Sequence, residues 1–139
     1  TTRRDGGHAP VRICMSRTLD LPFDAALWDV SVAPTIVMTQ RGARTAFQAM
    51  LRDRGVEVVE FDFLTPEGVA DYCYDRGFLQ CFWECGGVLS APCISGGVIH
   101  KVMAFVAPKI IGGDRAPTPV GELGFVEMTQ AVDLSDVVW

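Results

Sequence analysis

Short apolar runs recur along the chain, separated by segments in which apolar residues have helical spacing. The runs rich in Val, Ile and Phe cover residues 11–15, 35–39, 56–61, 78–84 and 98–107. Runs of this length and composition are typical of strands. Their alternation with helical segments predicts an α/β domain with a mostly parallel sheet flanked by helices.

Three helices are predicted between these strands. They cover residues 44–54, 66–76 and 88–95. Pro66 favours a helix start at that point, because proline is accepted in the first turn of a helix. A glycine follows the last residue of each predicted helix, at a position that commonly ends one, and these glycines are Gly55, Gly77 and Gly96.

The last part of the chain has a different character. Residues 112–124 are rich in Gly and Pro, which predicts an ordered excursion, or flap. Residues 126–139 predict one or two more strands. The sequence contains no internal repeat, low-complexity tract or linker, so we expect residues 1–139 to form a single domain.

Composition narrows the functional classes. The 139 residues, 49% of them hydrophobic, suffice for one well-buried core. A formal charge of -5 argues against general binding to nucleic acids, which depends on clustered cations. No apolar run approaches the roughly 18 to 20 residues that span a bilayer, and the first residues do not resemble a signal peptide. We expect a soluble protein that binds neither nucleic acids nor membranes.

The cysteines do not indicate a disulfide scaffold or a metal site. Their odd number and apolar surroundings favour free thiols in a reducing compartment. The spacing of the last three matches no paired zinc knuckle. We expect most of them to be buried structural thiols. The five are Cys14, Cys73, Cys81, Cys85 and Cys93.

Residues 82–97, FWECGGVLSAPCISGG, carry the candidate chemistry. A predicted strand leads into Gly86 and Gly87, which open a predicted helix. Glycines let a ligand approach the backbone, and a helix N-terminus offers N–H groups to a pyrophosphate. An ordinary tight turn would use the same residues. Glu84, at the carboxyl end of the strand, is placed to bind a ligand, although a surface carboxylate is the simpler interpretation.

The stretch ECGGVLSAPCISGGVIHKVMAFVAPKIIGG resembles the reductase domain of riboflavin biosynthesis, the C-terminal domain of the bifunctional deaminase/reductases. The resemblance extends back through PVRICMSRTLDLP and PTIVMTQRGA and forward through the flap. It is strongest to the plant and algal pyrimidine reductases. It implies a dihydrofolate reductase-like fold and NADPH as cofactor.

The resemblance also implies roles for particular residues. Glu84 and Arg3 match positions that bind the substrate. Ser16 matches a position that holds the adenosine end of the cofactor, although the alignment allows Arg17 there instead, and an arginine would suit a 2′-phosphate. The sequence assigns no catalytic residue. The cofactor-binding turn corresponds to Gly86, Gly87, Val88, Leu89, Ser90, Ala91 and Pro92.

Several features depart from the family pattern. The family's lysine, its Ser-x-Asp-Gly run and its Gly-Thr cofactor turn have no counterpart before Thr1, and the final strand is cut short at Trp139. We therefore expect the chain to be a fragment of a gene product. Pro92 predicts a helix that starts late or is kinked. His100 and Lys101 replace an acidic pair of bacterial members, and we expect no direct role for them.

The expected function is NADPH-dependent reduction of the ribosyl group of 5-amino-6-(5-phosphoribosylamino)uracil to a ribityl group. One alternative is a reductase of different specificity on the same scaffold. Another is a non-catalytic domain within a larger protein. The resemblance further implies a homodimer, a possible fused deaminase domain upstream, and a location in the plastid stroma, with the cytoplasm as the alternative.

Overall fold

The computed structural model describes residues 7, 9–110, 112–113 and 116–139. Its chain divides into two compact units, Thr1–Val69 and Ala70–Trp139. That the chain forms a single domain stays a prediction. In the part of the chain that the structure describes, no helix is long and apolar enough to cross a membrane.

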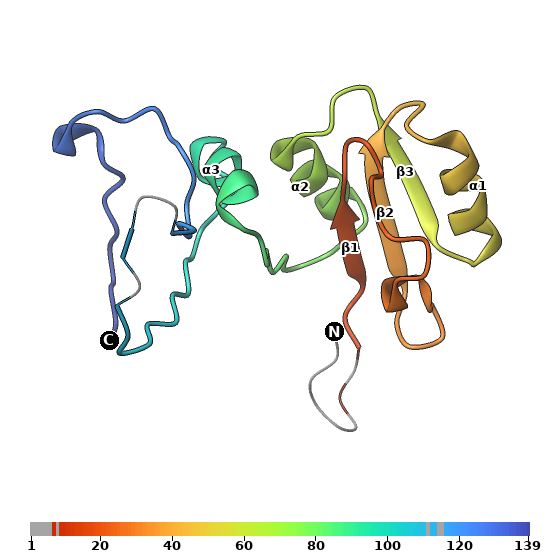
Figure 1. Cartoon of the computed structure of the whole chain (residues 1–139), viewed down its shortest axis with the longest axis horizontal. Coiled ribbons are helices and arrows are strands. Elements are labelled where there is room, and N and C mark those ends of the chain that lie inside the picture. Colours follow the sequence, from red (N-terminus) through yellow and green to blue (C-terminus); the bar gives the residue numbers. More distant parts are fainter. Residues whose placement is uncertain (1–6, 8, 111, 114–115) are drawn as a thin grey trace. The chain divides into compact units, whose positions relative to one another are not determined.

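The first unit contains a parallel sheet of three strands (Figure 1). The strands are β1 (Arg12–Met15), β2 (Thr35–Gln40) and β3 (Glu57–Phe61), in the order β1-β2-β3. β1 pairs with β2 and β2 with β3, both in parallel. Three predicted strands and the parallel sheet are thus confirmed, consistent with a dihydrofolate reductase-like α/β fold.

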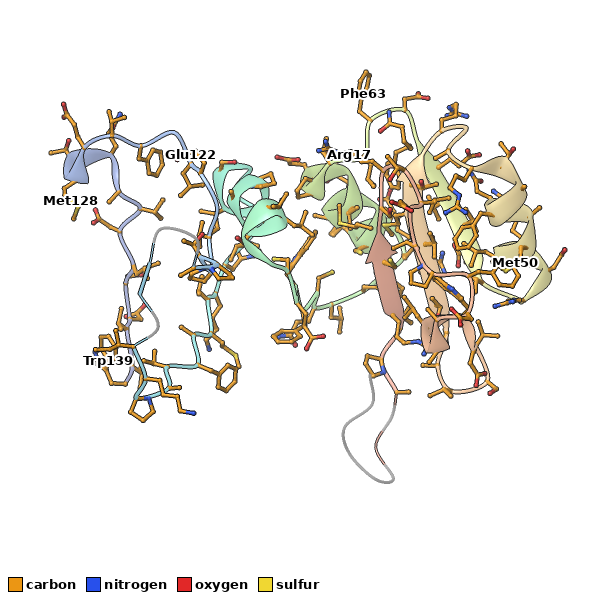
Figure 2. The ribbon with its side chains drawn as sticks, viewed as in Figure 1. Arg17, Met50, Phe63, Glu122, Met128 and Trp139 are labelled. Carbon is orange, nitrogen blue, oxygen red and sulfur yellow. The ribbon has the colours of Figure 1, made fainter. Side chains whose placement is uncertain are left out.

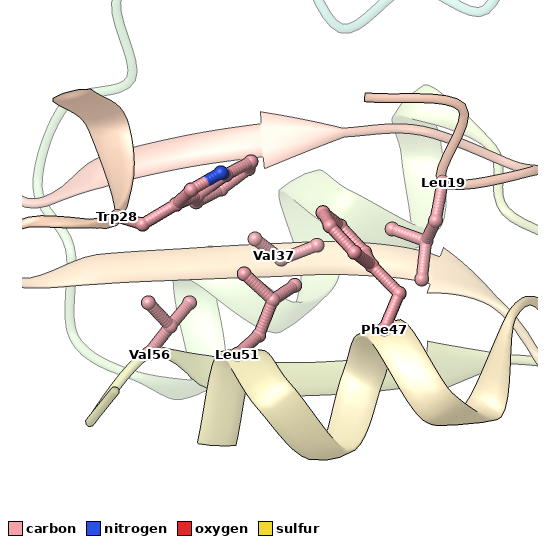
Figure 3. Close-up of a cluster of buried hydrophobic side chains, with 6 residues drawn as sticks. All are labelled: Leu19, Trp28, Val37, Phe47, Leu51 and Val56. Carbon is pink, nitrogen blue, oxygen red and sulfur yellow. The ribbon is translucent and has the colours of Figure 1, made fainter. Parts of the chain in front are cut away.

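Helix α1 (Thr45–Asp53) connects β2 to β3 and packs on the sheet. Its Phe47 and Leu51 point toward Val37 of β2 (Figure 3). Trp28, in the short 3₁₀ helix Ala26–Trp28, meets Phe47 edge to face, with ring centroids 6.0 Å apart. This cluster of buried side chains is the core of the unit, and it also includes Leu19 and Val56.

The end of α1 shows why a glycine follows the helix. The N–H of Val56 donates to the carbonyl of Leu51 at 3.0 Å, and the N–H of Gly55 donates to that of Arg52 at 2.9 Å. These two hydrogen bonds form the Schellman motif, which needs a residue in the left-handed conformation at the position of Gly55. Gly55 has a φ of 81°, a conformation that favours glycine. The predicted helix and its end are confirmed.

The second unit has helices but no strands among its described residues. Helix α2 (Pro66–Asp75) begins in the first unit and ends in the second, α3 (Gly87–Ser95) follows, and a 3₁₀ helix covers Met128–Gln130. The strands predicted at 78–84, 98–107 and within 126–139 were wrong for this structure. A strand needs a hydrogen-bonded partner to satisfy its backbone, and none of these segments has one. Many of their apolar side chains are exposed, as at Phe105.

None of the five cysteines, all of which lie among the described residues, forms a disulfide, and their burial differs. Cys73 and Cys93 are buried as predicted, whereas Cys81 is exposed. Burial, and to a smaller extent a hydrogen bond with Cys81, raises the pKa of the Cys73 thiol to about 12. Cys73 is therefore protonated at neutral pH, which suits a structural thiol.

Candidate functional site

The glycine pair lies at the start of α3, as the sequence predicted. Gly86 is the residue before the helix, and Gly87 is its first residue. The N–H groups of Leu89 and Ser90 donate to the carbonyl of Gly86 at 3.1 and 3.0 Å. Gly87 and Val88 precede these first intrahelical donors, so their N–H groups have no helical acceptor. The turn therefore presents backbone donors at the positive end of a helix.

The two glycines differ in whether the surrounding packing requires them. A Cβ added at Gly87 would lie 2.8 Å from the carbonyl oxygen of Thr118 and 3.2 Å from the nitrogen of Gly121. The packing of the chain thus excludes any side chain at Gly87. A Cβ at Gly86 would meet nothing within 4 Å. Its backbone, with a φ of -83°, is one that any residue adopts, so the described packing gives no reason for a glycine there.

Residues 118–121 of the predicted flap cover one side of this turn. The N–H of Gly121 donates to the carbonyl of Gly87 at 2.9 Å. The hydroxyl of Ser90 donates to the carbonyl of Pro119 at 2.8 Å. Figure 2 shows Glu122, the next residue, beside α3. The flap is ordered against the helix, and the sequence reasoning did not anticipate its contact with the glycine pair.

The other residues of the predicted cofactor turn differ in exposure. Val88 is exposed, Leu89 is half-buried, and Ser90 and Ala91 are buried. The hydroxyl of Ser90 is directed to the flap. Its side chain therefore faces protein, while the open side of the turn is formed by Gly86 and Val88.

Pro92 lies inside α3, which still begins at Gly87. The expected late start was wrong. Proline has no N–H, so the carbonyl of Val88, four residues earlier, lacks its usual helical donor. The first turn of α3 is thus held by fewer internal hydrogen bonds than that of an ordinary helix.

Glu84 is exposed and lies two residues before Gly86. The prediction placed it at the carboxyl end of a strand, but residues 78–84 form no strand. Its position near the turn follows from the sequence alone. Arg3 lies outside the described residues, as does His8.

Ser16 follows the last residue of β1, in the first unit. Its N–H donates to the carbonyl of Met38 at 3.0 Å, and its hydroxyl oxygen accepts from the N–H of Leu19 at 3.1 Å. Arg17 is exposed directly after it, and Figure 2 labels it at this end of β1. The carboxyl ends of parallel strands are where ligands of α/β sheets bind.

The same edge of the sheet carries charges that the sequence reasoning missed. Arg41 follows β2 and forms an ion pair with Asp62, which follows β3. Glu60 accepts hydrogen bonds from the side chain of Gln48 and from the N–H of Gly42, and these bonds lower the pKa of its carboxyl. A cation two residues after the end of the predicted strand 35–39 was the available signal for Arg41.

A separate hollow of about 440 Å³ lies over α1. None of the predicted site residues lines it. The described residues also contain no group of three or more His, Cys, Asp or Glu side chains able to hold a metal ion. The hollow is lined by Phe23, Arg44, Thr45, Ala46, Phe47 and Met50.

Comparison with known proteins gives a family match over nearly the whole chain. The model of the RibD C-terminal domain family matches residues 1–137. The chain is 61% identical over 139 residues, all of it, to riboflavin biosynthesis protein PYRR, chloroplastic, of Arabidopsis thaliana, covering 23% of that protein. It is 63% identical over 137 residues, 99% of it, to the Zea mays protein of the same name, covering 22% of that protein.

A bacterial relative carries a reductase name. The chain is 30% identical over 141 aligned residues to 2,5-diamino-6-ribosylamino-4(3H)-pyrimidinone 5′-phosphate reductase of Aquifex aeolicus, with 96% of the chain and 61% of that protein covered. The chain thus spans less than a quarter of the plant relatives, since it covers 23% and 22% of their lengths.

Proposed function

The chain belongs to the RibD C-terminal domain family, and from this premise we propose that the protein carrying it is the pyrimidine reductase of riboflavin biosynthesis. It reduces the ribosyl group of 5-amino-6-(5-phosphoribosylamino)uracil to the ribityl group, with NADPH as cofactor. The relatives named for riboflavin biosynthesis and for a reductase of a ribosylamino-pyrimidine phosphate support this proposal.

The open face at Gly86 is the observation that carries the cofactor assignment. The φ of Gly86 needs no glycine, and no neighbour lies within 4 Å of a Cβ added there. A ligand that approaches the backbone supplies the missing reason, because a side chain would hold it away. The N–H groups of Gly87 and Val88 then suit a pyrophosphate. When bound, NADPH supplies the hydride that the C1 carbon of the opened ribose accepts.

The remaining residues take the roles that the resemblance implies. Glu84 and Arg3 bind and orient the pyrimidine ribotide. Ser16, or Arg17 in its place, takes the adenosine end of NADPH; a guanidinium at this position would bind a 2′-phosphate in a bidentate way. Arg17 is exposed, so its guanidinium can reach a ligand.

Gly86→Val in the full-length protein tests the cofactor turn. The extended backbone and open surroundings accept the side chain, so the fold should persist, and a branched side chain on the open face should weaken NADPH binding at least tenfold. The measurement is the NADPH dissociation constant, with the melting temperature as control. Wild-type affinity in a folded variant would refute the assignment. Substitution of Gly87 does not discriminate, because it would also displace Thr118 and Gly121.

A second candidate substrate is favoured by the name of the Aquifex relative. It is 2,5-diamino-6-ribosylamino-4(3H)-pyrimidinone 5′-phosphate, which carries an amino group at C2 of the pyrimidine where the uracil ribotide has an oxygen. The ratio of kcat/KM for the two ribotides decides between them.

We also propose the wider setting of this reductase. The plant relatives are named chloroplastic, which supports the plastid stroma. Their greater length leaves room for a fused deaminase domain, and the family resemblance supports a homodimer. Mass measurement of the native full-length protein and an assay of deaminase activity test these two points.

A further inference from the structure

The first turn of α3 is intrinsically weak. Two adjacent glycines lose more backbone entropy on ordering than other residues would. No side chain of the residue before the helix caps it, because that residue is Gly86. Pro92 leaves the carbonyl of Val88 without its helical donor. An isolated turn of this composition would fray, and its N–H groups would not hold one direction.

Residues 118–121 supply the restraint that the turn lacks. The N–H of Gly121 binds the carbonyl of Gly87, and Ser90 binds the carbonyl of Pro119. Ser90 is only 8% exposed, so its hydroxyl is shielded from competing water. That hydroxyl has a single hydrogen to donate. Of its two possible acceptors, the carbonyl oxygen of Pro119 is nearer to the hydroxyl oxygen, at 2.8 Å, than that of Gly87, at 3.1 Å.

The backbones at Gly87 and Gly121 are too close together to leave room for a side chain at either residue. A Cβ at Gly121 would lie 2.6 Å from the carbonyl oxygen of Gly87, and one at Gly87 would lie 2.8 Å from that of Thr118. The two backbones therefore touch directly. At Gly86, by contrast, an added Cβ would meet nothing within 4 Å.

We propose that Ser90 is a positioning residue that fixes residues 118–121 against the first turn of α3 and so holds the N–H groups of Gly87 and Val88 ready for the cofactor. The inference rests on the proposed function of this turn. Ser90 acts through the backbone and does not itself bind the cofactor. The 118–121 segment is thus a fixed wall of the cofactor-binding turn, present before any ligand arrives, and its ordering cost is met during folding rather than on binding.

The test compares Ser90→Ala with Ser95→Ala in the full-length protein. Ser95 is a control on the same helix, because its hydroxyl, like that of Ser90, lies within hydrogen-bonding distance of the carbonyl three residues earlier, but it is exposed. Hydrogen exchange of residues 116–124 without cofactor reports the contact itself. We expect the Gly121 amide to lose protection in Ser90→Ala and to keep it in Ser95→Ala.

The functional readout is the NADPH dissociation constant and the separation of KM from kcat. Ser90→Ala should weaken NADPH binding about two- to tenfold, the scale of one hydrogen bond, with kcat at saturating NADPH unchanged. Gly121→Ala should weaken it further, because its methyl group forces the two backbones apart. Gly68→Ala is its control, since that Cβ would make only ordinary contacts, the nearest at 3.5 Å.

The outcomes separate the inference from the function beneath it. Equal protection of the Gly121 amide in wild type and Ser90→Ala would overturn the positioning role. So would lost protection with unchanged NADPH affinity. If Gly86→Val also binds NADPH normally, the cofactor turn itself is wrongly assigned; if only Gly86→Val weakens binding, the turn stands and the role of Ser90 falls.

Discussion

At the scale of single residues, the glycine pair shows how much a motif leaves undecided. The sequence allowed Gly86 and Gly87 to form either a phosphate-binding turn or an ordinary tight turn, and the structure supplies a packing reason for a glycine only at Gly87. Gly87 is required by the approach of Thr118, 31 positions away in sequence, which no local pattern contains. Gly86 has no such neighbour and keeps the ligand explanation.

Glu84 is the residue whose chemistry depends most on this assignment. We predict that Glu84→Gln in the full-length enzyme lowers kcat/KM for the pyrimidine ribotide about tenfold or more, as expected for a charge-assisted hydrogen bond of roughly 1.5 to 3 kcal/mol. NADPH affinity should not change. Glu67→Gln, at an exposed carboxylate in the first turn of α2, is the control and should leave both quantities unchanged. A shift in NADPH affinity with normal substrate kinetics would contradict the division of roles.

At the scale of elements, the sequence predicted the local features well and the non-local ones poorly. The strands at 11–15, 35–39 and 56–61 and the end of α1 at Gly55 follow from apolar runs and turn residues, which act within a few positions. The runs at 78–84 and 98–107 have the same composition but no hydrogen-bonded partner. Strand propensity describes a half-buried pleated surface, so it cannot supply the partner that a strand requires.

The end of α1 permits a test of whether a single residue, Gly55, determines where the helix ends. Gly55→Ala should reduce the free energy of opening at the Val56 amide by about 1 to 2 kcal/mol, because a Cβ is disfavoured in the left-handed region. The new methyl group would also lie 3.3 Å from a methyl of Val30, so that side chain must shift. Gly42→Ala shares the positive φ but meets nothing within 4 Å, and it should show the conformational cost alone. Native-state hydrogen exchange measures both, and equal effects at the two sites would show that Val30 adjusts without cost.

At the scale of the whole molecule, the second unit leaves many large apolar side chains exposed. Phe105, within the predicted strand 98–107, is 91% exposed. Ile110, just after it, is 99% exposed. Further large apolar side chains are exposed between residues 125 and 139. Unpaired apolar segments of this kind are sites of aggregation unless other chain covers them.

The 139 residues expressed alone should therefore be poorly soluble and should not oxidise NADPH with the pyrimidine ribotide. A longer protein from the same reading frame should be more soluble and should oxidise NADPH. Hydride transfer requires donor and acceptor carbons in near-attack geometry, and these residues cover only 23% and 22% of the plant relatives. The measurement is the loss of NADPH absorbance with time in the presence of the ribotide, beside the soluble fraction of each protein. Substitution of Phe105 and Ile110 by serine in the short chain separates the two effects: it should raise solubility without restoring turnover. Turnover by the soluble short chain at the rate of the longer protein would show that these residues already hold a complete site.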